Sequence, residues 1–261
     1  LELVARALYV HPHWAPVHLA AAMGFSRWLE RQLVDGDVRL TAPSDDGALP
    51  LHLAVERGRL EVTKVLVAKG ADVAKKDARL RTALHAAKTL EVLKELVATT
   101  GFREARDAED EDGRRPVEVA LRKGRPGCLE LLLQAGASTS PAATANGTRF
   151  LDSLSKEVRI TDDVCRSLHT LVLRAPDVLE QFNYQGRVWL HDVFDKRLLS
   201  SALSAVTSDS KRAALLAARD PQGLSPIAAA AMRNDLSIVC GLYSWGARVE
   251  EDEHALRIAA K

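Results

Sequence analysis

One block of six residues recurs along the first half of the chain at nearly constant spacing. Its fourth positions are 34, 33 and 33 residues apart, and glycines follow three of them after six and again after eighteen residues. The blocks are APVHLA at 15–20, LPLHLA at 49–54, TALHAA at 82–87 and RPVEVA at 115–120. Such a period indicates a repeat array, in which each unit becomes stable only when it is stacked on its neighbours.

The copy around His52 shows what one unit contains. Residues 45–47 form a polar turn, and Pro50 suits the first turn of a helix, where its missing N–H is not needed. Gly58 interrupts that helix, and a second apolar stripe follows before Gly70 ends the second helix. The stripe consists of Leu60, Val62, Val65 and Leu66. Because neither helix can bury its stripe alone, the pattern predicts pairs of short helices packed against further pairs.

The block at 49–54 is close to the pattern Thr-Pro-Leu-His-x-Ala of ankyrin repeats, and the chain therefore resembles the ankyrin-repeat family. The resemblance implies an all-α fold, an ankyrin-repeat solenoid of helix-turn-helix units with short hairpin-like finger loops. It implies about seven units, of which the fifth and sixth are degenerate. It also implies a structural hydrogen-bonding role for the motif histidines, which are His18, His52, His85 and His191.

The resemblance divides the chain into five segments. Residues 1–13 are expected to be an N-terminal capping helix or the remnant of a preceding unit, and residues 14–137 four ankyrin repeats. A degenerate repeat with a long loop follows at 138–182, and two further repeats at 183–249. Residues 250–261 are expected to be a truncated or capping helix, which suggests a fragment of something longer.

Some stretches depart from the regular pattern. In the third repeat the first helix is three residues shorter than in the second, and the connector 98–112 is correspondingly longer. Thr161 is a good N-cap for a helix in the fifth unit. Residues 189–191 take the motif position in the sixth, and Asn234 suits a left-handed backbone in the seventh. The predicted buried face of the fifth unit's helix is Val164, Leu168, Leu171 and Val172.

Composition argues against several classes of protein. The net charge of +1 gives no general attraction to nucleic acid or anionic lipid, and no run of about twenty apolar residues could span a membrane. Cys128, Cys165 and Cys240 are expected to be small buried hydrophobes in a reducing compartment rather than a disulfide framework. We therefore expect an intracellular protein, cytoplasmic or nuclear, that is monomeric by itself.

The sequence carries no catalytic or cofactor signature. It contains no phosphate-binding glycine loop, nucleophile elbow, HExxH helix or cysteine pair at zinc spacing. The motif histidines occur once per repeat, and helices pack about 10 Å apart, which is too far for shared metal ligation. We expect no enzymatic activity, no catalytic residue, no cofactor and no metal site.

Binding positions follow from the geometry of the family, whose members use the finger tips and the exposed positions of the first helices. The predicted partner-binding residues are Arg57, Arg79, Arg81, Glu111, Asp112, Arg114, Arg122, Lys123, Tyr184 and Arg187. Further positions of this kind are Asp45, Asp46, Glu56, Gln185, Asp195 and Lys196. Guanidinium groups beside an acidic finger suit a peptide that carries carboxylates or phosphates, and an ordinary solvated surface of mixed charge is the alternative.

Two functional hypotheses follow from the resemblance. The first is a non-enzymatic scaffold or adaptor module that mediates protein–protein interaction through the concave face of finger tips and first helices. The second is the regulatory ankyrin segment of a larger enzyme or channel, whose catalytic or pore part lies outside this chain. Sparse aromatic residues argue against a receptor for a small ligand.

Overall fold

The computed structural model of the protein describes residues 15–34, 37–45, 47–139, 151, 154, 158–183 and 185–248. Within these ranges the chain forms helices and turns without a β-strand, and one isolated bridge joins Phe182 and Val188. The predicted all-α class is therefore confirmed. The terminal helices expected at 1–13 and 250–261 lie outside the described residues.

The chain consists of two compact units. The first comprises Leu1–Val119 and Leu131–Ala137, and the second comprises Ala120–Glu130 and Ser138–Lys261. Helices α9 (Pro116–Arg122) and α10 (Pro126–Gln134) each contribute residues to both units.

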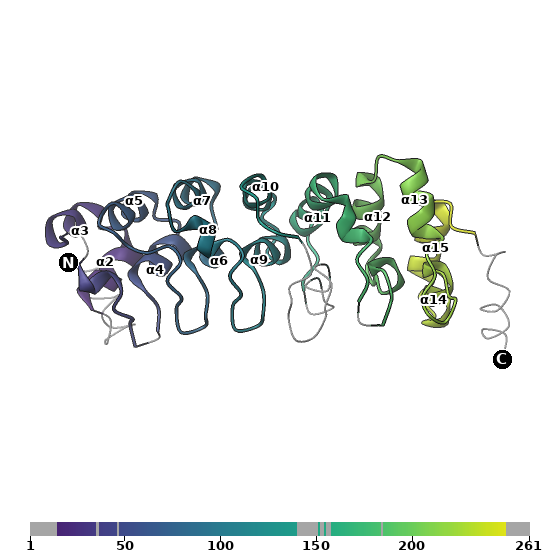
Figure 1. Cartoon of the computed structure of the whole chain (residues 1–261), viewed down its shortest axis with the longest axis horizontal. Coiled ribbons are helices and arrows are strands. Elements are labelled where there is room, and N and C mark those ends of the chain that lie inside the picture. The colour runs from purple at the N-terminus through teal and green to yellow at the C-terminus, as the bar shows by residue number, and fades with distance from the viewer. Residues whose placement is uncertain are drawn as a thin grey trace. The chain divides into compact units, whose positions relative to one another are not determined.

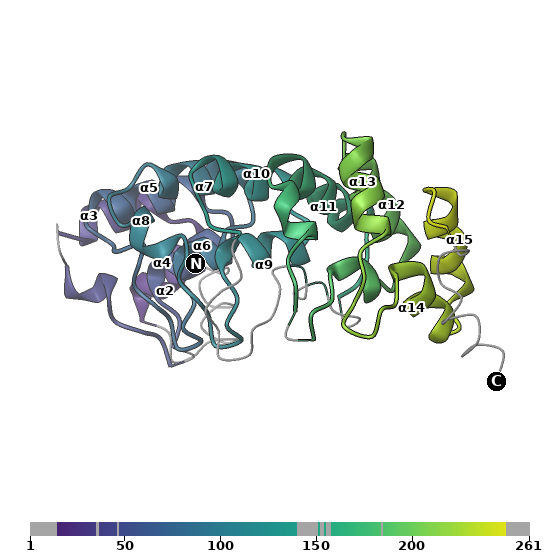
Figure 2. The same ribbon diagram turned by 45° about the vertical axis from the view of Figure 1, so that its right-hand side comes forward.

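The first unit is a row of helical hairpins (Figure 1). First helices contact one another in the order α2, α4, α6, and second helices in the order α3, α5, α7. Turned by 45°, the same unit has these two rows above its finger loops (Figure 2). Its elements are α2 (Pro16–Met23), α3 (Ser26–Gln32), η1 (Val38–Leu40), α4 (Pro50–Glu56), α5 (Leu60–Ala68), α6 (Ala83–Ala86), α7 (Leu90–Val97) and α8 (Phe102–Ala105).

Helices α4 and α5 form as the sequence predicts. Pro50 is the first residue of α4, and the chain turns at Gly58 so that α5 can fold back on α4. Ala54 and Leu66 have no exposed surface, because each helix places its apolar stripe against the other and against the neighbouring hairpins.

The third hairpin compensates for a short first helix. Helix α6 has only four residues, and Thr82 and His85 form a capping box at its start. The longer connector holds α8, a helix that the sequence analysis did not predict, and Phe102 and Ala105 of α8 are buried. The connector therefore adds buried apolar surface to the unit, and its length also restores the repeat period.

The second unit contains helices of successive repeats that pack side by side, and one helical pair, α14 with α15. Helix α11 packs along α12, α12 contacts α15, and α14 contacts both α15 and η4. Helix α13 was not predicted, and the Ser208 side chain caps its start. The elements are α11 (Asp162–Arg174), η3 (Pro176–Leu179), η4 (Trp189–His191), α12 (Lys196–Ala205), α13 (Asp209–Leu216), α14 (Pro226–Met232) and α15 (Leu236–Ser244).

Local predictions for the second unit have mixed outcomes. The Thr161 hydroxyl accepts a hydrogen bond from the Val164 amide, and the predicted apolar face of α11 is buried, which confirms both predictions. Asn234 has the predicted left-handed backbone, with φ of 57°. In the sixth repeat, however, the motif forms the short 3-10 helix η4 instead of a longer first helix. The Asp195 side chain consequently caps α12, so the prediction that Asp195 and Lys196 end a first helix is wrong.

The predicted burial of the cysteines is confirmed for two of the three. Cys128 and Cys165 are buried, as predicted, and none of the three cysteines forms a disulfide. Cys240 is exposed, which contradicts the prediction. It lies on the face of α15 that also carries Tyr243, which is 68% exposed.

Candidate functional site

Each described finger hairpin is held by one polar side chain, eight residues before the motif position. The Asp77 carboxylate accepts hydrogen bonds from the amides of Arg79 and Arg81, both at 2.9 Å. Asp110, Asn183 and Asp220 accept from the same two positions of their own fingers at 2.8–3.0 Å. In the third finger the Asp77 amide also donates to the Arg81 carbonyl at 2.9 Å. One side-chain oxygen therefore fixes the backbone of the hairpin.

Neighbouring fingers of the first unit are joined through their backbones. The Ala78 amide donates to the Gly47 carbonyl at 3.1 Å, and the Glu111 amide donates to the Arg79 carbonyl at 3.0 Å. Lys76 Nζ adds a bond to the Glu109 carbonyl at 3.0 Å. The tips consequently form a connected row rather than independent loops.

The motif histidines connect each first helix to the finger that follows it. Nε2 of His52 donates to the Arg81 carbonyl at 2.7 Å, and Nε2 of His85 donates to the Arg114 carbonyl at 3.0 Å. His18 and His191 make the corresponding bonds to the carbonyls of Ala42 and Leu224. This confirms their predicted structural role.

Burial determines the charge state of these histidines. It lowers the pKa of His18, His52, His85 and His191 and outweighs the bonds to carbonyls, which favour the charged form. Glu118 replaces histidine in the fourth repeat and accepts a bond from the Arg115 amide at 2.8 Å. Burial raises the pKa of Glu118.

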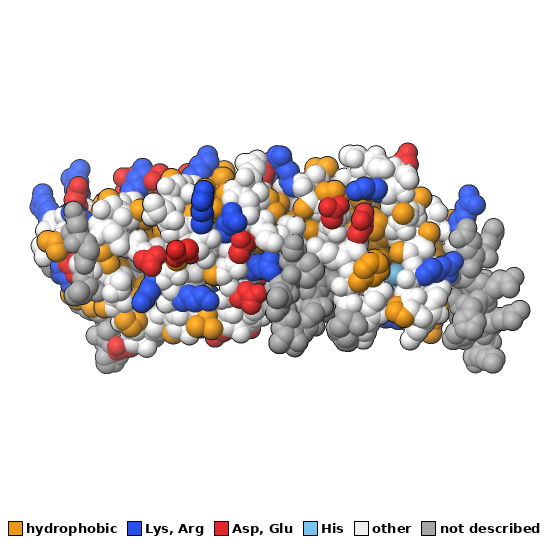
Figure 3. All heavy atoms as spheres, viewed as in Figure 1, with side chains coloured by type: hydrophobic (Ala, Val, Ile, Leu, Met, Phe, Trp, Pro, Cys, Tyr) orange, Lys and Arg blue, Asp and Glu red, His pale blue; other side chains and the backbone are white. Residues whose placement is uncertain are grey.

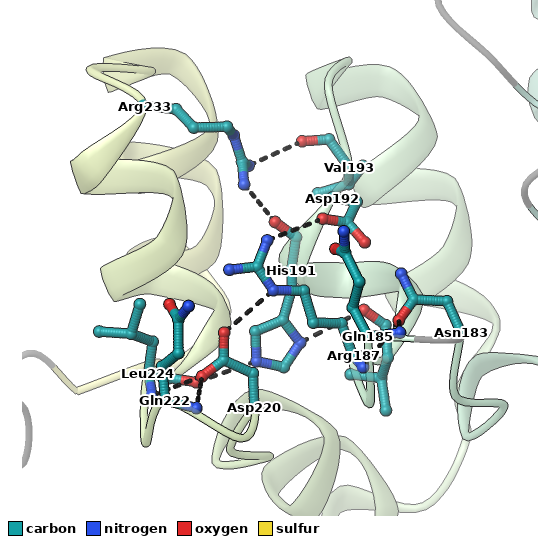
Figure 4. A network of polar contacts seen from close by, with 11 residues as sticks. Asn183, Gln185, Arg187, His191, Asp192, Val193, Asp220, Gln222, Leu224 and Arg233 are labelled. Atoms are coloured by element: carbon teal, nitrogen blue, oxygen red, sulfur yellow. Dashed lines mark hydrogen bonds and ion pairs between the residues drawn. The ribbon is translucent and has the colours of Figure 1, made fainter.

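The second unit contains a denser polar network (Figure 4). Arg187 Nε donates to Asp220 Oδ2 at 3.0 Å, and its Nη1 lies 3.6 Å from Asp192. The Asp220 side chain has no exposed surface. Arg233 donates to the carbonyl oxygens of His191 and Val193 and so satisfies the end of η4. This network binds the sixth finger to the seventh.

Asp220→Ala should lower the free energy of unfolding by about 1–3 kcal/mol, because the Gln222 and Leu224 amides and Arg187 lose their common buried acceptor. Urea denaturation followed by the fluorescence of buried Trp189 measures this change. Asp177→Ala is the matched control, since the Asp177 side chain is 83% exposed and pairs loosely with Lys211 at 3.7 Å. That substitution should cost less than about 1 kcal/mol. Equal losses would contradict the assigned role of Asp220.

Comparison with known proteins agrees with this finger-and-helix geometry. The sequence profile of a family described as "Ankyrin repeats (3 copies)" matches residues 2–77. The solved ankyrin repeat domain of Bcl-3, described as a unique member of the IkappaB protein family, superposes with a TM-score of 0.60 at 20% identity, and the match covers 88% of this chain and 98% of that one. Residues 2–77 therefore carry ankyrin repeats. The likeness to the solved domain confirms the predicted ankyrin solenoid fold.

Curated relatives share part of this chain. Inversin of Gallus gallus is 34% identical over 122 residues, and the human transient receptor potential cation channel subfamily A member 1 is 34% identical over 125 residues. A Saccharomyces cerevisiae protein named "Probable 26S proteasome regulatory subunit p28" is 30% identical over 124 residues. These matches cover 45–46% of this chain, 11% of the first two relatives and 54% of the third. Ankyrin repeats are in general protein-interaction modules.

In the first ankyrin unit some of the predicted binding residues form ion pairs within the protein and others do not. Arg57 at the end of α4 and Arg79 at a finger tip are exposed, and among the described residues their guanidinium groups make no ion pair. Arg81 instead pairs with Asp77 at 2.7 Å, and Arg114 pairs with Asp112. Both arginines therefore support fingers. The face of this unit in Figure 3 carries cations and anions interspersed.

Glu111 and Asp112 are exposed on the fourth finger of the first unit, and the remaining predicted residues belong to the second unit or lie outside the described part. Arg122 and Lys123 are at the end of α9 and are half-buried and exposed, respectively. Arg187 is committed to the network around Asp220, with 24% of its side chain exposed. Tyr184 lies outside the described residues.

Sequence reasoning missed the side chains that cap the ankyrin fingers. The signal was available, because Asp77, Asp110, Asn183 and Asp220 each stand eight residues before a motif position. Across the described ranges, no cluster of three or more His, Cys, Asp or Glu side chains could hold a metal ion. None of the described helices combines the length and apolar character needed to cross a bilayer.

Proposed function

We propose that the chain is a non-enzymatic scaffold or adaptor module that binds an acidic or phosphorylated peptide segment of another protein. The binding surface would be the finger tips and first-helix ends of the first unit. The observation that carries this proposal is the pair of exposed arginines, Arg57 and Arg79, which have no ion-pair partner in the described part of the chain. The Arg79 backbone is held by Asp77 and by the Glu111 amide, and Arg57 is the C-cap of α4.

The chemistry of arginine supports this choice of partner. Its planar guanidinium can donate two parallel hydrogen bonds to a carboxylate or a phosphate. An uncommitted group on a rigid framework loses little freedom on binding, whereas Arg81 and Arg114 would first have to leave their aspartates. Glu111, exposed on the next finger, would favour a peptide that also carries a cation.

A second candidate is the regulatory ankyrin segment of a larger enzyme or channel. The matched region makes up only 11% of inversin and of the cation channel, which is compatible with a module inside a longer chain. The sequence of the parent transcript on both sides of residues 1–261 would distinguish the two. For either candidate we propose a place inside the cell, in cytoplasm or nucleus, because cysteines outside disulfides suit a reducing compartment.

Charge reversal at Arg57 and Arg79 should abolish or strongly weaken peptide binding. The measurement is the affinity of wild type and of the Arg57→Glu/Arg79→Glu variant for acidic peptides and their phosphorylated forms at two salt concentrations. The wild-type affinity should fall as salt rises, because exposed charges are screened over about 8 Å at physiological ionic strength.

Arg27→Glu/Arg31→Glu is the matched control, since both arginines are exposed on α3, a second helix of the same unit. This variant should bind as wild type does. Arg81 is unsuitable for reversal because a glutamate there would repel buried Asp77. Equal affinity of all three proteins would place the site elsewhere.

A further inference from the structure

Leu80 occupies a backbone conformation that is unfavourable for leucine. Its φ is 57°, in the left-handed region that side chains with a Cβ rarely adopt. It stands five residues before the motif position, where the other described fingers have glycine at positive φ. Those glycines are Gly47, Gly113, Gly186 and Gly223.

The finger imposes this conformation on Leu80. Its amide donates to the Asp77 carbonyl at 3.0 Å, and the Asp77 side chain holds the residues on both sides, Arg79 and Arg81. The Glu111 amide adds the bond to the Arg79 carbonyl. Leu80 therefore cannot relax without breaking the hairpin, and the strain persists in the folded chain.

Burial accounts for only part of the leucine side chain. The residue is 49% exposed, and this part of its apolar surface remains in water and gives no stability. Strained backbone that the fold does not need is found mainly at functional sites. An exposed apolar side chain on a rigid tip is a feature expected of a binding anchor.

The hairpin that carries Leu80 has a positive net charge, and the next finger places Glu109 and Glu111 beside it. The hairpin 72–81 carries Lys75, Lys76, Arg79 and Arg81 against Asp72 and Asp77. Asp77 is buried and already paired with Arg81, whereas Lys75 and Arg79 are exposed. A partner that covers Leu80 must therefore meet cations around it.

We propose that Leu80 is an apolar anchor for a peptide segment in which carboxylates flank a large apolar side chain. The apolar side chain packs on Leu80, and a carboxylate beside it accepts hydrogen bonds from Arg79. This inference rests on the proposed function and adds to it a specificity determinant that charge alone does not supply.

The first test measures the strain. Leu80→Gly should raise the Tm, because glycine adopts this φ without a steric penalty. Gly223→Leu is the matched control at the equivalent tip, where an added Cβ meets nothing within 4 Å and φ is 80°. It should lower the Tm. Gly47 is unsuitable, since a Cβ there would lie 2.1 Å from the Ala78 Cβ. A Tm that is unchanged or lower for Leu80→Gly would overturn the inference.

The second test uses a displayed library of random peptides selected on the wild-type chain. Enriched peptides should contain Asp or Glu beside Leu, Ile, Phe or Trp, and Leu80→Gly should bind them about tenfold more weakly or worse. Gly223→Leu should bind them as wild type does.

The outcomes separate the two proposals. Acidic peptides without an apolar residue, bound equally by Leu80→Gly but lost on Arg79→Glu, would overturn the anchor and leave the proposed function standing. Peptides unaffected by either substitution, or no enrichment at all, would overturn both.

Discussion

Replacement of Leu66 by alanine should lower the free energy of unfolding by about 2–5 kcal/mol. Leu66 has no exposed surface and lies on α5, which contacts α3, α4 and α7. The substitution removes apolar burial and leaves a cavity among three helices that cannot all move to fill it. In a repeat array such a loss also weakens the interfaces to both neighbouring units.

Urea denaturation with circular dichroism at the helix band measures this loss. Leu236→Ala is the matched control, because Leu236 is 71% exposed on α15, and it should change the free energy by about 0.5 kcal/mol or less. If Leu66→Ala cost no more than the control, α5 would not face the stack.

Acidification below pH 6.5 should destabilise the fold steeply. The folded-state pKa of each buried motif histidine lies below its ordinary value of 6.5, chiefly through burial. As pH falls through 6.5 the unfolded chain takes up protons that the folded chain does not, so the equilibrium moves towards unfolding. Each histidine contributes a slope of up to about 1.4 kcal/mol per pH unit, until the pH reaches its folded-state pKa.

Buried carboxylates also change the dependence of stability on pH, some stabilising the fold at acid pH and others destabilising it. Glu118 has a raised pKa through burial, so its stabilising contribution is present at acid pH and is lost as pH rises through the folded value. Burial alone would raise the pKa of Asp77, but hydrogen bonds from the Arg81 side chain and amide lower it overall. The contribution of Asp77 is therefore lost only at lower pH, below the ordinary carboxyl range.

The pH dependence is measured as urea midpoints between pH 7.5 and about 5, a range set by the ordinary histidine pKa. His52→Gln should reduce the slope, because glutamine can still donate to the Arg81 carbonyl but does not titrate. The slopes are compared rather than the absolute stabilities. A slope equal to that of wild type would contradict the neutral, buried state assigned to His52.

The helices could be predicted from sequence where their signals are local. Pro50, Gly58 and the stripe that includes Leu66 lie within one unit, and α4 and α5 form as expected. Helices α8 and α13 escaped prediction because they fall in connectors, where the repeat pattern gives no expectation. The motif of the sixth repeat also became the short η4, with its end satisfied by Arg233, which is 42 residues away from His191 in sequence.

The candidate site was harder to predict, because whether a charged side chain forms an ion pair within the protein depends on residues that are distant in sequence. Arg187 and Asp220 are 33 residues apart, and no local pattern indicates that they pair. Arg79 and Arg81 look alike in the sequence, yet only Arg81 reaches the Asp77 carboxylate. The strain at Leu80 becomes visible only when its backbone is compared with the glycines of the other fingers.

The side-chain cap of each finger separates two kinds of sequence position. Asp77 sets the hairpin through backbone amides, so the residues directly after it, Ala78 and Arg79, contribute none of their own side-chain atoms to holding the loop. In the seventh finger the Asp220 carboxylate holds the amides of Gln222 and Leu224 in the same way. The tip residues of such a finger can therefore be substituted while the hydrogen bonds that hold its backbone remain. Substitution at such a position should therefore change the chemistry of the tip while the hydrogen bonds to the Asp77 carboxylate are kept.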